Sequence, residues 1–179
     1  MKTINVLNPA TEKVIGEVPD QTAEEVHKAV SRAKKAYEHW RRTPAHEKAE
    51  MLHEIAGRVK ERTEELATIL TREGGKPLRE NRDEMGWVAS CFDFYAESAR
   101  ASRGRVIPST EISQLNLVVK EPYGVVGAIV PWNYPILLMS WKLAPALASG
   151  NTVVLKPAEQ TPLSTLAFQK IFDCLPNGV

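Results

Sequence analysis

Apolar and polar residues near the start of the chain follow the periods of a hairpin and then of an amphipathic helix. They alternate over residues 3–7 and 13–18 on either side of Asn8-Pro9, which predicts a β-hairpin. Over residues 20–40 the period becomes helical, and Thr22 and Glu25 have the spacing of a capping box. The apolar stripe expected to face the core consists of Val26, Ala29, Val30, Ala33, Tyr37 and Trp40.

Three more helices are predicted before residue 102. Thr43-Pro44 opens the first, Thr63 can cap the second, and Gly74-Gly75 is the expected stop before a long third helix that begins at about Pro77 and ends near Ala101. The side chains expected to point inward are Leu52, Ile55 and Val59, then Leu66, Ile69 and Leu70, then Met85, Val88, Phe92, Tyr95 and Ala99.

Residues 105–121 change from a helical to an alternating period, with Leu115, Leu117 and Val119 apolar. This alternation predicts a half-exposed hairpin, whose open edge is an aggregation liability. The chain therefore divides into an N-terminal part (residues 1–104), the hairpin segment (105–121) and the stretch that follows (122–179).

The last stretch has the pattern of two parallel strands joined by a buried helix. Residues 125–130 and 152–155 are short apolar runs rich in β-branched side chains, as expected for strands that are covered on both faces. Between them, Pro135 suits the first turn of a helix that is apolar nearly all round, and Gly150 suits the left-handed position after its end. These elements form a βαβ unit, which almost always has a right-handed crossover.

A further helix is predicted from Thr161-Pro162, as N-cap and first residue, to about Leu175. Because parallel strands point the same way, the loops that follow them meet at one edge, where open α/β sheets bind ligands. The side chains there are chemically complementary: Asn133 can donate to a developing oxyanion, Lys156 can reach hydroxyls or phosphate, and Glu159 can accept from a ribose diol.

At these residues the chain resembles the aldehyde dehydrogenase superfamily. Residues 124–135 (GVVGAIVPWNYP) and 141–162 (WKLAPALASGNTVVLKPAEQTP) match that family's cofactor-domain signature in order and spacing. Asn8-Pro9-Ala10-Thr11 is similar to its opening turn, and Gly75-Lys76-Pro77-Leu78 to its mid-helical loop. The resemblance implies an α/β fold, an incomplete Rossmann-like cofactor-binding domain with an N-terminal helical part and a protruding β-hairpin that contributes to subunit association.

The resemblance also implies a role for each candidate residue. Asn133 is similar to the oxyanion-hole amide, the kind of donor whose removal costs about 2.7–4 kcal/mol in the transition state. Lys156 and Glu159 resemble the pair that holds the adenosine ribose hydroxyls. The other expected cofactor-binding residues are Ile129, Val130, Pro131, Trp132 and Ala158, and the expected wall of the substrate tunnel consists of Tyr134, Leu138 and Trp141.

The implied reaction is the NAD(P)-dependent oxidation of a small-molecule aldehyde to a carboxylic acid, or to a thioester in some members. A carboxylate at Glu159 repels a 2′-phosphate and favours NAD over NADP, although some members with this glutamate accept both. The family's nucleophilic cysteine, general-base glutamate and second glycine motif lie downstream of Val179. The chain is therefore expected to be an N-terminal portion that is inactive alone, from an enzyme that forms a homodimer or homotetramer.

Composition argues against several other classes of protein. A net charge of +1 with 25% charged residues makes nucleic acid and anionic membranes poor partners. Two cysteines do not make a disulfide scaffold, and the absence of a signal or transmembrane pattern predicts a cytoplasmic protein. No metal site is expected, because Thr43-Pro44 interrupts the seven-residue recurrence of His39, His46 and His53.

Other interpretations stay open at this point. The chain could be a non-catalytic nucleotide-binding module, or a structural fragment that needs a complementing chain to cover its open sheet edge. The turn at Trp132-Asn133 could merely start a helix, since asparagine is a good N-cap, and Lys156 could be a surface lysine. Cys91 and Cys174 are expected to be structural, because no histidine or carboxylate is placed to activate them.

Overall fold

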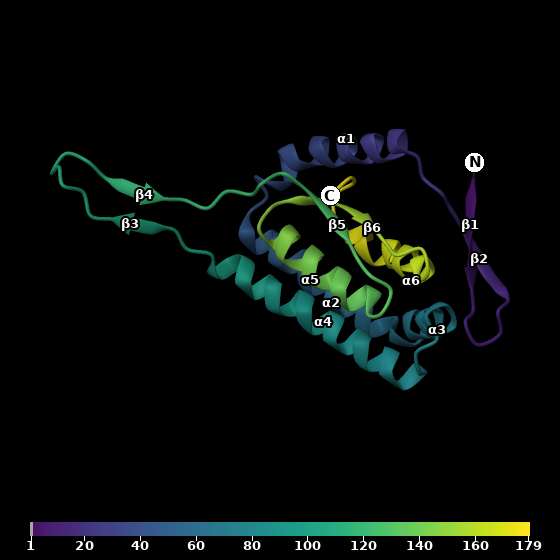
Figure 1. Ribbon diagram of the computed structural model, residues 1–179. Helices are drawn as coiled ribbons and strands as arrows, with labels where there is room; N and C mark the ends of the chain where they lie inside the picture. The colour runs from purple at the N-terminus through teal and green to yellow at the C-terminus, as the bar shows by residue number, and fades with distance from the viewer. Residues whose placement is uncertain (1) are drawn as a thin grey trace.

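The computed structural model describes residues 2–179 as helices around a small parallel sheet, with two hairpins (Figure 1). In chain order the elements are β1 (Thr3–Leu7), β2 (Val14–Pro19), α1 (Ala23–Trp40), α2 (Ala45–Glu61), α3 (Thr63–Gly74), α4 (Leu78–Ala101), β3 (Arg105–Ile107), β4 (Asn116–Val118), β5 (Val125–Ile129), α5 (Pro135–Ala148), β6 (Thr152–Lys156), α6 (Pro162–Ala167) and a 3₁₀ helix, η1 (Phe168–Cys174). Helix α1 lies on one side of β5 and β6, and α5 lies on the other with α2 and α4 behind it. No helix among these residues is both long and apolar enough to cross a membrane.

The first helix follows its predicted boundaries but not its whole predicted stripe. The capping box of Thr22 and Glu25 is present, with both of its hydrogen bonds. Of the stripe, Val26 and Val30 are exposed, whereas Trp40 is buried and its indole N–H donates to the carbonyl of Leu147 at 3.2 Å. The inward prediction is wrong for the two valines, because no part of residues 2–179 covers the stripe near the start of α1, whereas Ala33 and Trp40 further along are buried.

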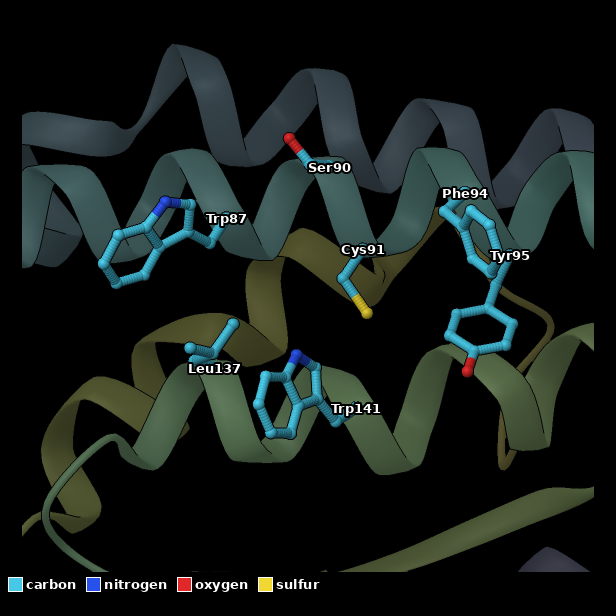
Figure 2. A pocket seen from close by; sticks show the side chains of 7 residues that line it. All are labelled: Trp87, Ser90, Cys91, Phe94, Tyr95, Leu137 and Trp141. Carbon is cyan, nitrogen blue, oxygen red and sulfur yellow. The ribbon is translucent and has the colours of Figure 1, made fainter.

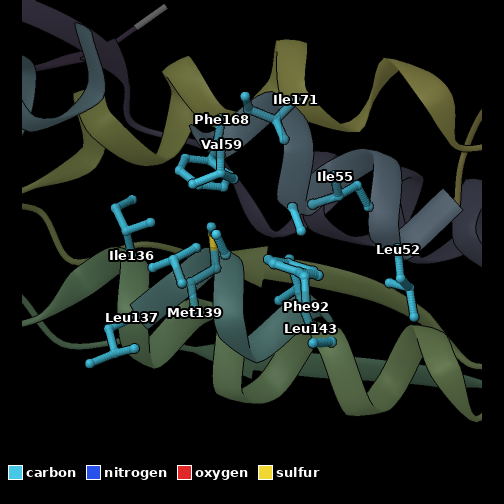
Figure 3. Close-up of a cluster of buried hydrophobic side chains, with 14 of the residues drawn as sticks. Leu52, Ile55, Val59, Phe92, Ile136, Leu137, Met139, Leu143, Phe168 and Ile171 are labelled. Carbon is cyan, nitrogen blue, oxygen red and sulfur yellow. The ribbon is translucent and has the colours of Figure 1, made fainter. Parts of the chain in front are cut away.

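The next three helices form most of the core. Leu52, Ile55 and Val59 are fully buried, as predicted, and pack with side chains of α4, α5 and η1 (Figure 3). Burying one such side chain contributes about 1.5–3 kcal/mol. Thr63 is not the cap of α3: it is the first helical residue, and its hydroxyl donates back to the carbonyl groups of the preceding turn. Gly75 ends α3 in the left-handed conformation, at φ +74°, as predicted.

Strands β3 and β4 pair antiparallel and project from the body of the molecule (Figure 1). The alternating pattern predicts that the apolar side chains of the hairpin are buried on one face. Instead, Leu115, Val119 and Val106 are all exposed. Its apolar side chains lie away from the core cluster, so the half-exposed prediction is wrong in that neither face is covered within residues 2–179.

Strands β5 and β6 pair in parallel, with Val125 opposite Thr152 and Ile129 opposite Lys156. The prediction that both faces are covered is wrong. Thr152 lies under α1 and donates to the carbonyl of Ala33 at 3.0 Å, but at the other end of the same face Ile129 is 73% exposed. The cover therefore extends only over the first part of that face.

The predicted end of α5 is confirmed, whereas the predicted length and side-chain cap of α6 are not. At the end of α5, Gly150 adopts φ +90°, and the amides of Gly150 and Asn151 donate to Leu147 and Ala146, which is the predicted left-handed termination. Helix α6 is shorter than predicted, and the segment continues to Cys174 as 3₁₀ helix. Thr161 occupies the N-cap position, but its hydroxyl makes no capping bond.

Candidate functional site

The loops that follow β5 and β6 leave the sheet side by side. The strands stay in register to their last residues, and the amide of Val130 donates to the carbonyl of Lys156 at 3.2 Å. Residues 131–134 and 157–161 therefore emerge at the same carboxyl edge, which carries Pro131, Trp132, Asn133, Ala158 and Glu159. Ala158 is buried, whereas Trp132 and Ile129 are exposed toward solvent.

Lys156 and Glu159 form an ion pair at this edge. The ammonium of Lys156 donates to Oε1 of Glu159, and each side chain is 54% exposed. The hydrogen bond from Lys156 is the main cause that holds the pKa of Glu159 below its usual value, so this carboxyl group is ionised at neutral pH. Because an exposed pair contributes at most about 1 kcal/mol, a ligand that bonds to both groups can open it at little cost.

Asn133 lies in the loop just before α5 and is exposed. The N-cap residue of α5 is Tyr134 and no side chain caps that helix from this position, so the interpretation that Asn133 merely starts a helix is wrong. A cavity of about 200 Å³ separates this loop from the turn between α3 and α4. Its lining consists of Leu70, Gly74, Gly75, Lys76, Asn81, Trp132 and Asn133.

An aromatic groove of about 790 Å³ runs between α4 and α5 (Figure 2). It is lined by Trp87, Ser90, Cys91, Phe94, Tyr95, Leu137 and Trp141. Of the three residues predicted to form a substrate wall, Trp141 lines the groove and Tyr134 packs against the ring of Trp87, at 6.5 Å between centroids. Leu137 also lines the groove, because it lies four residues before Trp141 on the same helical face, whereas Leu138 is half-buried and is not part of the lining.

Comparisons with known proteins agree with this geometry. The sequence model of the aldehyde dehydrogenase family matches residues 1–179. The chain belongs to the aldehyde dehydrogenase family. Lactaldehyde dehydrogenase of Escherichia coli (strain K12) is 42% identical over 178 residues, which cover 98% of this chain and 37% of that protein. Aminoaldehyde dehydrogenase 2 of Zea mays is 43% identical, over 99% of this chain and 36% of its own length.

Solved aldehyde dehydrogenase structures superpose on nearly the whole chain. The crystal structure of lactaldehyde dehydrogenase from Escherichia coli has a TM-score of 0.98 at 41% identity, over 100% of this chain and 38% of that one. A betaine aldehyde dehydrogenase variant from Staphylococcus aureus, solved in complex with NAD+, has a TM-score of 0.95 at 37% identity and covers 98% and 36%. The chain thus has the α/β aldehyde dehydrogenase fold and spans a little more than a third of the length of these relatives.

Two carboxylates that pattern reasoning missed lie beside the loops of this aldehyde dehydrogenase chain. Glu84 is fully buried on α4, and its Oε1 accepts from the amide of Leu137 at 3.0 Å. Glu73 is 3% exposed near the end of α3, and it accepts from the amides of Leu163 at 2.7 Å and Ser164 at 2.9 Å. A signal was present in the sequence: both glutamates fall at inward positions of apolar helical stripes.

Neither cysteine of the chain has the surroundings of a nucleophile. Burial raises the pKa of the Cys91 thiol, which points into the space between α4 and α5 (Figure 2). Burial is also the main cause that raises the pKa of Cys174, whose Sγ lies 3.7 Å from the carbonyl of Ile171. Both thiols are therefore protonated at neutral pH.

Proposed function

We propose that this chain is the N-terminal part of an enzyme that oxidises an aldehyde to a carboxylic acid with NAD(P)+. The observation that carries the proposal is that two loops leave one sheet edge together: one presents the side-chain amide of Asn133, which does not cap α5, and the other presents the Lys156–Glu159 pair. An amide N–H donor beside a diol-binding pair is what an oxyanion site next to a dinucleotide site requires.

In this proposal, Lys156 and Glu159 hold the adenosine ribose hydroxyls, and Ile129, Val130, Pro131, Trp132 and Ala158 line the cofactor cleft. The donor set suits the cofactor, since an ammonium and an ionised carboxylate together can donate to and accept from a diol. NAD is favoured over NADP because the Glu159 carboxylate repels a 2′-phosphate. When bound, NAD(P)+ supplies the acceptor for the hydride that leaves the substrate carbon.

Asn133 would stabilise the negative charge that develops on the aldehyde oxygen, while Tyr134, Leu138 and Trp141 border the path of the substrate. The nucleophilic thiolate comes from a cysteine outside this chain, because Cys91 and Cys174 both have raised pKa values. The exposed β3–β4 hairpin is proposed to serve subunit association in a homodimer or homotetramer. The cytoplasmic location stays a prediction.

A titration of NAD into the purified chain, followed by tryptophan fluorescence, tests the cofactor site. We expect saturable binding, weakened about tenfold or more by Lys156→Ala and by Glu159→Ala, since each removes a charged hydrogen-bond partner. The matched controls are Lys28→Ala and Glu24→Ala, which break another exposed lysine–glutamate pair, on α1. Equal affinity in all five proteins would remove the basis for this assignment, and no binding by any of them would favour a structural fragment.

Asn133 needs an assay of turnover. Residues 1–179 joined to the remaining two thirds of Escherichia coli lactaldehyde dehydrogenase give a chimaera in which aldehyde oxidation can be followed. Asn133→Ala is expected to lower kcat by about 10²–10³-fold, the usual effect of losing one oxyanion donor. Asn5→Ala, an exposed asparagine on β1, is the control and should leave kcat unchanged. An Asn133→Ala chimaera as active as its parent would refute the role.

A further inference from the structure

We infer that Glu73 and Glu84 are positioning residues that orient the two loops of the site separately: Glu84 orients the loop of Asn133, and Glu73 orients the loop of Lys156 and Glu159. The functional meaning of this inference rests on the proposed function. Its structural claim is that each buried carboxylate orients one loop and not the other. This claim can be tested without measuring turnover.

Glu84 holds the start of α5. Its side chain is fully buried, and one carboxylate oxygen accepts from the amide of Leu137, which lies in the first turn of that helix. The other oxygen accepts from the ammonium of Lys76 at 2.5 Å. Both oxygens are therefore engaged, and the carboxylate cannot move without breaking a bond to the helix or to the lysine.

Lys76 extends this contact to the residue next to Asn133. Its ammonium lies 3.7 Å from the centroid of the Tyr134 ring, and Trp87 packs against the same ring. Tyr134 is the N-cap residue of α5 and directly follows Asn133. The backbone on the C-terminal side of Asn133 is thus fixed by an aromatic contact at Tyr134 and by a hydrogen bond at Leu137, and on the other side by the end of β5.

Glu73 holds the start of α6 in a similar way. Its two oxygens accept from the amides of Leu163 and Ser164, so a single carboxylate bridges the first turn. The loop between β6 and α6 contains Glu159 and is closed by a bond from the amide of Thr161 to the carbonyl of Ala158, at 3.3 Å. Pairing with β5 fixes the beginning of this loop, and Glu73 fixes its end.

Helices α5 and α6 need carboxylate acceptors for the same reason. Each begins with a proline, Pro135 or Pro162, and neither has a side-chain cap from its own N-cap residue. The amides that follow the proline in the first turn have no intrahelical acceptor, and they require one when they are buried. Glu73 and Glu84 supply these acceptors from either side of the turn between α3 and α4, the same turn that borders the cavity beside Asn133.

The test is NMR spectroscopy of the purified 179-residue chain labelled with ¹⁵N. In Glu84→Gln we expect the Asn133 side-chain amide and the Tyr134 amide to shift, with Lys156 and Glu159 unmoved. In Glu73→Gln we expect the reverse. Glu80→Gln, an exposed carboxylate in the first turn of α4, is the control and should move neither loop. The inference would be overturned if either variant shifted the signals of both loops alike. It would also be overturned if each variant shifted only the first-turn helix amides that its glutamate accepts from.

If a glutamine variant does not fold, Glu84→Asp and Glu73→Asp keep the charge and withdraw the oxygens by one methylene, with the same two patterns expected. The unsubstituted chain offers a second route for Glu73. Burial raises the pKa of Glu73, while Lys156 lowers the pKa of Glu159, so Glu73 titrates at a higher pH than Glu159. The amide signal of Ala158 should follow the higher transition, and a signal that follows only the lower one would contradict the role of Glu73.

Kinetics in the chimaera gives the functional reading. Glu84→Gln is expected to lower kcat about tenfold or more at an unchanged KM for NAD, and Glu73→Gln to raise that KM at an unchanged kcat. Combining Glu84→Gln with Asn133→Ala should be no worse than Asn133→Ala alone. If the NMR patterns hold while Asn133→Ala has no effect, the proposed function fails and the positioning stands; if Asn133 matters but the patterns are absent, only the positioning fails.

Discussion

Replacing Lys76 with methionine is expected to destabilise the fold by about 3–5 kcal/mol, because it leaves a buried carboxylate without its counter-charge. The Lys76 side chain is 18% exposed and that of Glu84 is 0% exposed, so water cannot replace the lost ammonium. The Leu137 amide still satisfies one oxygen of Glu84, but the other loses its only partner within residues 2–179. Loss of the cation–π contact with Tyr134 accounts for about 0.5–2 kcal/mol of this cost.

Urea unfolding followed by circular dichroism measures this change against a total stability of about 5–15 kcal/mol. The corresponding fall in Tm is about 6–20 °C for a chain of this size. Lys60→Met is the control: its partner Asp93 is at the surface, with side chains 60% and 36% exposed, so the loss should be under about 1 kcal/mol. The double variant Lys76→Met/Glu84→Gln should be more stable than Lys76→Met. A Lys76→Met cost as small as that of Lys60→Met, or a double variant with no recovery, would refute the reasoning.

Three further predictions concern pH and backbone. The protonated ring of His53 donates to Asp93, which also pairs with Lys60, and to Glu97, and these hydrogen bonds raise the pKa of His53 above 6.5. The contribution of His53 to stability is therefore present below pH 6.5 and lost as pH rises through the folded value, so His53→Gln should flatten that part of the curve of unfolding free energy against pH. Burial raises the pKa of Glu73 above 4.5, so stability from this group is likewise present below pH 4.5 and lost above it, and Glu73→Gln should abolish that decline in the same measurement. Gly75→Ala should cost about 1–2 kcal/mol or more in urea unfolding, since φ is +74° and the new Cβ would lie 2.7 Å from Cγ of Pro9, whereas Gly57→Ala, in open space on α2, should gain about 0.5–1 kcal/mol.

The sequence predicted most helices and strands because their periods are local. Stripes such as Leu52, Ile55 and Val59 and stops such as Gly75 depend on residues within one or two turns, and these predictions were confirmed. Exposure was harder to predict, because it depends on what packs on each face. The apolar run over residues 125–130 indicated two covered faces, yet one of them is open at Ile129. Val26 and Val30 failed for the same reason.

Caps were predicted well only where both partners lie in one turn. Thr22 and Glu25 satisfy each other within four residues, so their spacing is sufficient. Thr63 and Thr161 have the residue type of a cap but do not act as one, since a threonine hydroxyl can also bond backward or make no bond. For the site itself, the sequence predicted that the two loops lie together, because they follow parallel strands. It did not predict that Glu73 on α3 and Glu84 on α4 hold these loops in place.

That support follows from two facts considered together, of which the sequence shows only one. Helices α5 and α6 each begin with proline after a residue whose side chain does not cap them, which leaves buried amides that need acceptors. Helices α3 and α4 each carry one glutamate among inward residues, at Glu73 beside Leu70 and at Glu84 beside Met85, which leaves buried carboxylates that need donors. In an apolar core each set is costly unless it meets the other. The inward glutamates can be found in the sequence, but the missing cap of α6 cannot, because Thr161 has the residue type of a cap. The contact of α3 and α4 with the two loops could therefore be predicted only once the structure had shown which amides lack an acceptor.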